Sequence, residues 1–210
     1  MVLDGGTNPA WYTPIMRREV ALSRCLRVGI VALAPTDELL SNVGMAAWTA
    51  SGAREVEEAL PADAFQVIRP LVVHGGNVDE VRTVLRDWCD APNRAVRCDL
   101  IFTVGGDGIS QRDVIPDATR DVIERELPGL ADRLKAAPSV TAKQSGDAPD
   151  RSADAVLSRA TAGTRGQTLI VNIPGFHERP GAAVRLLLPL LPDALAALGV
   201  DAFEEPRTVS

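Results

Sequence analysis

Short apolar segments alternate with amphipathic segments along the first half of the chain. The apolar segments are rich in β-branched residues, as buried strands are, and lie at residues 27–33, 65–73 and 98–104. The two segments between them, residues 51–60 and 77–89, carry apolar side chains at helical spacing, and Ser51 is the expected N-cap of the first. This order of strands and helices is typical of βαβ units. It predicts an α/β fold with a mostly parallel sheet covered on both faces.

The middle of the chain predicts two further helices and a loop. A helix over residues 116–126 begins with Pro116 at its first position, where proline is favoured, and ends at residues 127–129. A short helix is expected from Leu130 onward. The following residues 138–154 are polar and contain Gly, Pro, Ser and Asp, which predicts a flexible loop.

A turn and a strong apolar strand open the last part of the chain. The turn is predicted at Arg165 and Gly166, and the strand, TLIVNI, at residues 168–173. Residues 180–198 predict a helix that is kinked or restarted near Pro192, because proline lacks the N–H group that continues a helix.

Length and composition indicate one globular domain. The 210 residues are 46% hydrophobic and 24% charged, which is ordinary for a globular protein and allows a substantial core. Residues 1–26 have no clear period and are interpreted as an N-terminal extension. We expect the single domain at residues 27–200 and a C-terminal tail at residues 201–210.

The charge and the cysteines limit the classes of function and partner. A formal net charge of −6 argues against binding of nucleic acids or anionic membranes, since phosphate backbones need a basic surface. The three cysteines lie far apart without a zinc-binding spacing, and we expect a cytoplasmic protein. We find no signal-peptide pattern and no apolar run long enough for a membrane span. A small anionic ligand held by backbone N–H groups is compatible with this charge.

The segment TVGGDGISQRDVIPDAT, residues 103–119, follows the third strand and carries candidate chemistry. Open α/β sheets bind ligands beyond the carboxyl ends of their strands. Gly105, Gly106 and Gly108 let the backbone approach an anion closely, so the loop is a candidate phosphate site. The alternative is a plain strand-to-helix turn, because the segment is neither a Walker A loop nor a GxGxxG motif.

Two charged residues behind these glycines each have two interpretations. Asp113 can hold Mg²⁺ against phosphates, or it can cap the turn before Pro116. Arg112 can neutralise a phosphate, or it is an exposed surface charge. Two further candidate loops, residues 157–159 and 172–175, are turns or caps by default.

Both regions resemble the molybdenum-cofactor biosynthesis domain family, which includes molybdopterin adenylyltransferases. Residues 98–135 are similar to its first signature, a Gly-Gly-Thr-Gly loop, an Asp-Val-x-Pro stretch and a helix ending in Pro-Gly. Residues 156–175 are similar to its second, with Ser-Arg, a glycine turn and Asn-Leu-Pro-Gly. The resemblance implies a three-layer αβα fold of the molybdopterin-binding-domain type and a homotrimer.

The resemblance also implies an activity and a set of site residues. Adenylyltransferases of the family transfer AMP from Mg²⁺-bound ATP to the terminal phosphate of molybdopterin, so a pterin-like anionic substrate, ATP and Mg²⁺ are implied. Asp113 matches the family's metal-associated, catalytic aspartate. The implied ligand- and phosphate-binding residues are Gly105, Gly106, Gly108, Ser110, Arg112, Ser158, Asn172, Pro174 and Gly175.

Several loops depart from the family pattern. Asp107 stands where the family has threonine, and His74 with residues 75–77 replaces a second acidic stretch. Residues 176–180 resemble an insertion. A second hypothesis is therefore a repurposed paralogue in specialised metabolism, with His74, Asp107, His177 and Glu178 as new acid–base groups. The alternative for each histidine is an ordinary loop residue. A third hypothesis is a ligand-binding trimer without turnover.

Overall fold

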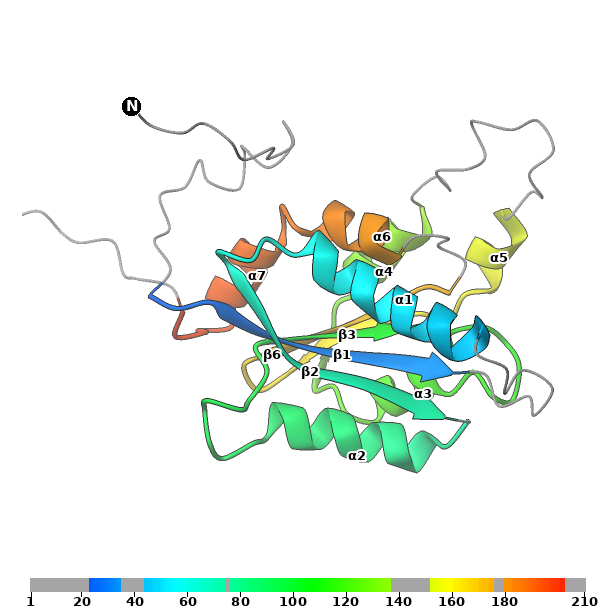
Figure 1. Ribbon diagram of the computed structural model, residues 1–210, viewed down its shortest axis with the longest axis horizontal. Helices are drawn as coiled ribbons and strands as arrows, with labels where there is room; N and C mark the ends of the chain where they lie inside the picture. Colours follow the sequence, from blue (N-terminus) through cyan, green and yellow to red (C-terminus); the bar gives the residue numbers. More distant parts are fainter. Residues whose placement is uncertain (1–22, 35–43, 75, 137–151, 176–179, 203–210) are drawn as a thin grey trace, which may run out of the picture.

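The computed structural model describes residues 23–34, 44–74, 76–136, 152–175 and 180–202. Within this part of the chain, six strands form one sheet between two layers of helices (Figure 1). The strands are β1 (Leu26–Ala34), β2 (Phe65–His74), β3 (Leu100–Val104), β4 (Arg125–Glu126), β5 (Ala162–Arg165) and β6 (Thr168–Ile173). The helices are α1 (Gly44–Ala59), α2 (Val78–Cys89), α3 (Ile115–Arg120), α4 (Pro128–Lys135), α5 (Ser152–Leu157), α6 (Pro180–Leu187) and α7 (Leu191–Ala197).

The sheet has the strand order β2-β1-β3-β6-β5-β4. Strands β2, β1, β3 and β6 are parallel, whereas β5 and β4 add to the sheet in antiparallel orientation. Every residue of β3 and β6 is buried, as expected for central parallel strands covered on both faces. The predicted α/β fold with a mostly parallel sheet is therefore confirmed.

Two apolar cores, one on each face of the sheet, hold the layers together. Helices α1, α4, α6 and α7 cover one face, where Leu100, Phe102 and Val171 lie in the core. Helices α2 and α3 cover the other face, where Ile101 and Ile170 pack against residues of both helices. Consecutive residues of β3 and β6 thus enter opposite cores, which explains why both strands are apolar without interruption.

Some predicted boundaries differ from the structure. The expected helix at residues 116–126 ends at Arg120, and Pro128 begins α4 instead of ending a helix. The reason is pairing with β5, because Glu124 N–H donates to the Thr164 carbonyl at 2.7 Å. The tertiary contact outweighs the local helical pattern of this segment.

Two shorter corrections concern helix starts. Ser51 is not an N-cap, because α1 already begins at Gly44 and the alanine-rich residues before Ser51 continue the helix. The predicted loop at 138–154 ends earlier, since α5 begins at Ser152. The predicted restart near Pro192 is confirmed by α6 and α7, which meet at an angle of 61°. Among the described helices, no single one is long and apolar enough to cross a membrane, although α6 and α7 taken together as a bent pair are.

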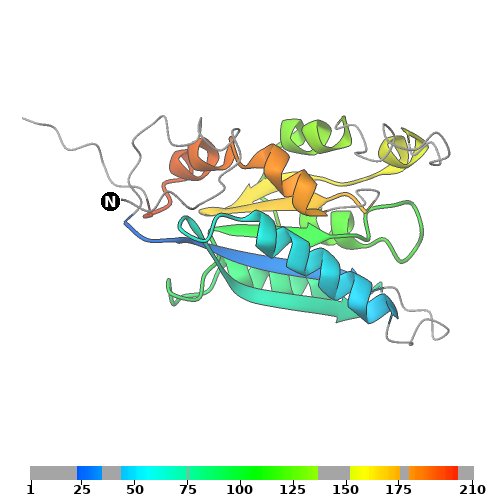
Figure 2. The same ribbon diagram turned by 45° about the horizontal axis from the view of Figure 1, so that its top comes forward.

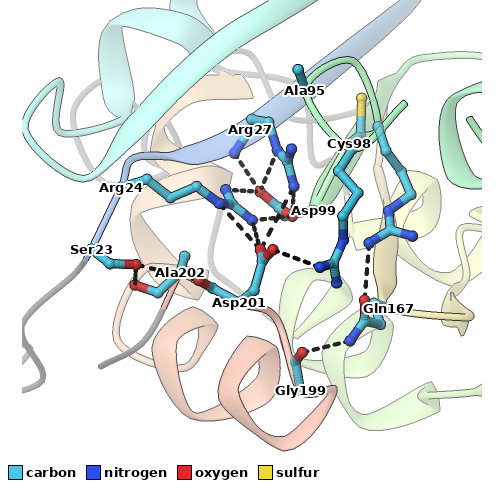
Figure 3. Close-up of polar contacts among 12 residues, drawn as sticks. Ser23, Arg24, Arg27, Ala95, Cys98, Asp99, Gln167, Gly199, Asp201 and Ala202 are labelled. Atoms are coloured by element: carbon cyan, nitrogen blue, oxygen red, sulfur yellow. Dashed lines mark hydrogen bonds and ion pairs between the residues drawn. The ribbon is translucent and has the colours of Figure 1, made fainter. Parts of the chain in front are cut away.

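A polar cluster fastens the two ends of the described chain at the amino ends of the strands (Figure 3). The buried Asp99 carboxylate accepts hydrogen bonds from Arg24 at 2.7 and 3.0 Å and from Arg27 at 2.9 Å. Arg24 also pairs with Asp201, and Ser23 N–H donates to the Ala202 carbonyl at 2.9 Å. The packed unit therefore extends past the expected limits of residues 27 and 200.

Candidate functional site

The glycine loop, residues 105–114, leaves the carboxyl end of β3 and leads into α3. Figures 1 and 2 place this loop and α5 at the same end of the molecule, toward which the parallel strands point. Gly105 and Gly106 have positive φ angles of 78° and 66°, which side chains rarely tolerate. A Cβ atom on Gly106 would also overlap the Leu33 side chain. Gly105 and Gly106 are thus required by the backbone of this turn.

Three consecutive backbone N–H groups of the glycine loop are candidate donors to a ligand. Within the described part of the chain, the N–H groups of Asp107, Gly108 and Ile109 have no hydrogen-bond acceptor. Successive N–H groups after left-handed residues form a concave site that suits phosphate oxygens. The geometry therefore meets the first requirement of the phosphate-binding interpretation.

Asp107 connects the glycine loop to two other predicted ligand loops. Asp107 is 5% exposed, and its Oδ1 accepts a hydrogen bond from Gly175 N–H at 2.6 Å. Its Oδ2 accepts a hydrogen bond from the Ser158 hydroxyl. Ser158 and Gly175, predicted from separate segments of the sequence, therefore meet at one carboxylate. Pro174, directly before Gly175, is buried.

Arg159 braces the glycine loop from behind. Its Nε donates to the Gly108 carbonyl at 2.7 Å, and its Nη2 donates to the Asp113 carbonyl. Its Nη1 lies 3.0 Å from both carboxylate oxygens of Asp117 on α3. The Gly108 carbonyl shares its peptide group with Ile109 N–H, so the bond from Arg159 Nε helps to fix the direction of that N–H group. The backbone N–H of Arg159 donates to the Asp107 carbonyl at 2.7 Å, which does the same for Gly108 N–H. The Ser-Arg motif is the only sequence signal for this role, and Arg159 is not among the predicted site residues.

Asp113 holds the turn inside the glycine loop. Its Oδ2 accepts a hydrogen bond from Ser110 N–H at 2.8 Å, and its own N–H donates to the Ser110 carbonyl at 3.0 Å. A Cβ atom on Gly108 would lie 2.8 Å from the same Oδ2, so this glycine allows a close approach. The turn-capping interpretation of Asp113 is thus confirmed, while its metal-binding role stays a prediction.

The described acidic groups fit a magnesium ion only if phosphates complete its coordination. Among the described residues, no group of three or more His, Cys, Asp or Glu side chains can hold a metal. Mg²⁺ keeps several waters and commonly uses one or two carboxylates together with substrate phosphates. Asp113 can supply one such carboxylate, whereas both oxygens of Asp107 are already hydrogen-bonded.

Asn172 lies beneath the site and does not line it, contrary to the implied role. Its side chain is fully buried, and its Nδ2 donates to the Thr103 and Thr119 hydroxyls, each at 2.9 Å. Its Oδ1 accepts a hydrogen bond from Thr161 N–H at 3.1 Å. The asparagine thereby joins β3, β6 and α3 below the loops, because its amide can donate and accept at once.

The remaining predicted residues lie at the rim of the glycine loop or outside the described residues. Arg112 and Ser110 are exposed, and Arg112 N–H donates to the Ser110 hydroxyl at 3.2 Å. A Cβ atom on Gly76 would lie 2.8 Å from Arg112 Cα, so the segment after β2 packs against this loop. His177 and Glu178 lie outside the described residues. His74 ends β2.

Large apolar side chains are exposed next to the same loops. Ile109 is 69% exposed in the glycine loop, and Val156 and Leu157 at the end of α5 are 83% and 48% exposed. Ile109 is two residues from Asp107, and Leu157 directly precedes Ser158, so the Asp107–Ser158 hydrogen bond brings both segments together. Apolar groups beside polar donors are typical of sites for ring-containing ligands.

Comparison with known proteins connects this geometry to one family. A family model described as a probable molybdopterin binding domain matches residues 55–193. The molybdenum cofactor synthesis protein cinnamon of Drosophila melanogaster is 32% identical over 123 residues, covering 59% of this chain but only 18% of that protein's length. The molybdopterin adenylyltransferase of Helicobacter pylori strain J99 is 27% identical over 162 residues, covering 72% of this chain and 84% of the relative.

A solved structure extends this similarity to the whole fold. The molybdopterin biosynthesis enzyme MoaB of Thermus thermophilus superposes with a TM-score of 0.64 at 31% identity. The similarity covers 85% of this chain and 99% of that enzyme. The three-layer arrangement described above is thus shared with a molybdopterin biosynthesis protein along nearly its full length. Since the family model matches more than half of the residues, this chain belongs to the family of probable molybdopterin binding domains.

Proposed function

We propose that this protein is a molybdopterin adenylyltransferase, which transfers AMP from ATP to the terminal phosphate of molybdopterin. In this reaction a phosphate oxygen of molybdopterin attacks the α-phosphorus of ATP, and pyrophosphate leaves as the bond to the β-phosphate oxygen breaks. The observation that carries the proposal is the set of N–H groups on Asp107, Gly108 and Ile109 without an acceptor in the described chain. The adenylyltransferase among the relatives supports the choice of reaction.

The protein's contribution to this reaction would be positioning and charge stabilisation. Reactions at phosphorus need little covalent chemistry from the enzyme, so fixed donors around the phosphates supply most of the catalysis. The glycine loop provides such donors, and Arg159 binds the Gly108 carbonyl with its side chain and the Asp107 carbonyl with its backbone N–H. Ile109, Val156 and Leu157 offer apolar surface for a pterin or adenine ring.

Asp113 is the residue we assign to magnesium, which would arrive with ATP. When bound, the ion would neutralise part of the negative charge on the phosphates. Asp113 already fixes the turn through Ser110 N–H, so the carboxylate has a defined position in the loop. The homotrimer implied by the family resemblance belongs to the same proposal.

The position of Asp107 favours a second candidate, a family member with a different substrate. The carboxylate replaces the threonine of the family signature and occupies the Ser158 and Gly175 donors. A rebuilt ligand cleft on a retained fold gives this pattern, since fold alone does not fix function. An enzyme of this kind would bind an anion at the glycine loop without adenylylating molybdopterin.

The direct test is product formation with purified protein, molybdopterin and Mg²⁺-bound ATP. We expect adenylylated molybdopterin and an equal amount of pyrophosphate, both followed by chromatography and mass spectrometry. Asp113→Asn should lower the rate at least about a hundredfold, the scale typical for loss of one transition-state contact. The matched control is Asp132→Asn, which removes the same charge from an exposed position on α4. Absence of product with the unaltered protein would refute the proposal and leave the second candidate.

A further inference from the structure

Asp107 places a negative charge inside the turn that offers N–H groups to a ligand. Its carboxylate accepts hydrogen bonds from one backbone N–H group and one hydroxyl, and phosphate oxygens accept from the same kinds of donor. A Cβ atom on Gly175 would lie 3.1 Å from Asp107 Oδ1, so a side chain at this position would crowd the carboxylate. The carboxylate therefore behaves as an internal anion bound by the ligand loops.

Covalent geometry keeps this charge near any anion on the glycine loop. A phosphate oxygen bound to Asp107 N–H would lie within roughly 7 Å of the carboxylate of the same residue, given ordinary bond and hydrogen-bond lengths. Asp107 is 5% exposed, so solvent screens this repulsion only weakly. Glycine or threonine at this position would carry no such charge.

We propose that Asp107 is a specificity-determining residue, which makes the glycine loop accept polyphosphates carrying a divalent cation and reject free anions. A cation bound to the polyphosphate would reduce its negative charge and so its repulsion from Asp107, whereas a free polyphosphate would meet that repulsion in full. The inference rests on the proposed function only in that the glycine loop receives a phosphate group. It defines the ligand class as metal-bound polyphosphate.

The test is calorimetric titration of the full chain with ATP and with pyrophosphate, each with Mg²⁺ and with chelator. The variants are Asp107→Asn, which keeps the shape and one acceptor oxygen but replaces the other with an amide donor, and Asp107→Thr, which restores the family residue. Asp132→Asn again controls for the loss of one negative charge, and circular dichroism shows which variants fold. Using two variants keeps the test decisive if one of them does not fold.

We expect the unaltered protein to bind both probes with Mg²⁺ and at least about tenfold more weakly without it, as for like charges in partly buried surroundings. Asp107→Asn and Asp107→Thr should bind the metal-free probes at least about tenfold more tightly, with smaller changes for the metal-bound probes. Equal metal-free affinities in the folded variants and the unaltered protein would overturn the inference. If the Asp107 variants gain metal-free binding but the unaltered protein forms no adenylylated molybdopterin, the inference is supported and the proposed function is refuted.

Discussion

Replacement of Arg159 tests whether the glycine loop owes its shape to this side chain. Arg159→Ala removes the donors to the Gly108 and Asp113 carbonyls and the ion pair with Asp117. A hydrogen bond from a charged donor contributes about 1.5–3 kcal/mol, and two such bonds at the lower end give about 3 kcal/mol. The lower end of this energy range applies because the Arg159 side chain is 33% exposed, so solvent weakens its hydrogen bonds. The exposed pair with Asp117 adds only about 0.5 kcal/mol.

Loss of the Arg159 contacts should weaken ligand binding as well as lower the stability of the fold. We expect the free energy of unfolding to fall by about 3 kcal/mol in Arg159→Ala, measured by urea denaturation. The dissociation constant of Mg²⁺-bound ATP should rise at least about tenfold, because Ile109 N–H loses its fixed direction. Arg159→Lys keeps the charge but cannot reach both carbonyls with a planar fork, so it should recover less than half of each effect. Wild-type affinity for ATP in a folded Arg159→Lys variant would refute the bracing role.

Two further predictions concern backbone conformation and acid stability. Gly106→Ala should lower the free energy of unfolding by about 2–4 kcal/mol, because of its φ of 66° and the overlap with Leu33. The control is Gly129→Ala, because nothing lies within 4 Å of the added Cβ atom, and its free energy of unfolding should stay within about 1 kcal/mol of that of the unaltered protein. Equal melting curves for the two variants would be inconsistent with this explanation. Burial raises the pKa of the Asp99 carboxyl, but hydrogen bonds from its arginine partners outweigh it and hold that pKa below its ordinary value. The carboxylate therefore stabilises the fold above about pH 3.9 and loses this contribution as pH falls through its folded pKa, and Asp99→Asn should show less acid dependence in urea titrations.

The sequence pattern predicted the parallel part of the sheet because those strands are apolar on both faces. β3 and β6 lie between two cores and are therefore readable as continuous apolar runs. β5 and β4 carry no comparable signal, since β4 consists of two exposed residues and β5 begins Ala-Gly. They exist through pairing with β6 and with each other, which depends on segments far apart in the sequence.

In the candidate site, too, the features that depend on neighbouring residues were predictable, whereas the contacts between distant segments were not. The glycine loop was predictable because its conformation depends on Gly105 and Gly106 themselves. The contacts of Asp107 with Ser158 and Gly175 span 51 and 68 residues, so no local pattern reveals them. Asn172 follows the same rule, because only the fold shows that its amide is used by three buried neighbours.

Calorimetric titration with Mg²⁺-bound ATP shows directly whether the glycine loop is a phosphate site. We expect saturable binding at one site per chain and at least about a tenfold loss of affinity in Arg159→Lys. Absence of binding by the folded, unaltered protein would contradict this expectation and would leave the loop as a strand-to-helix turn.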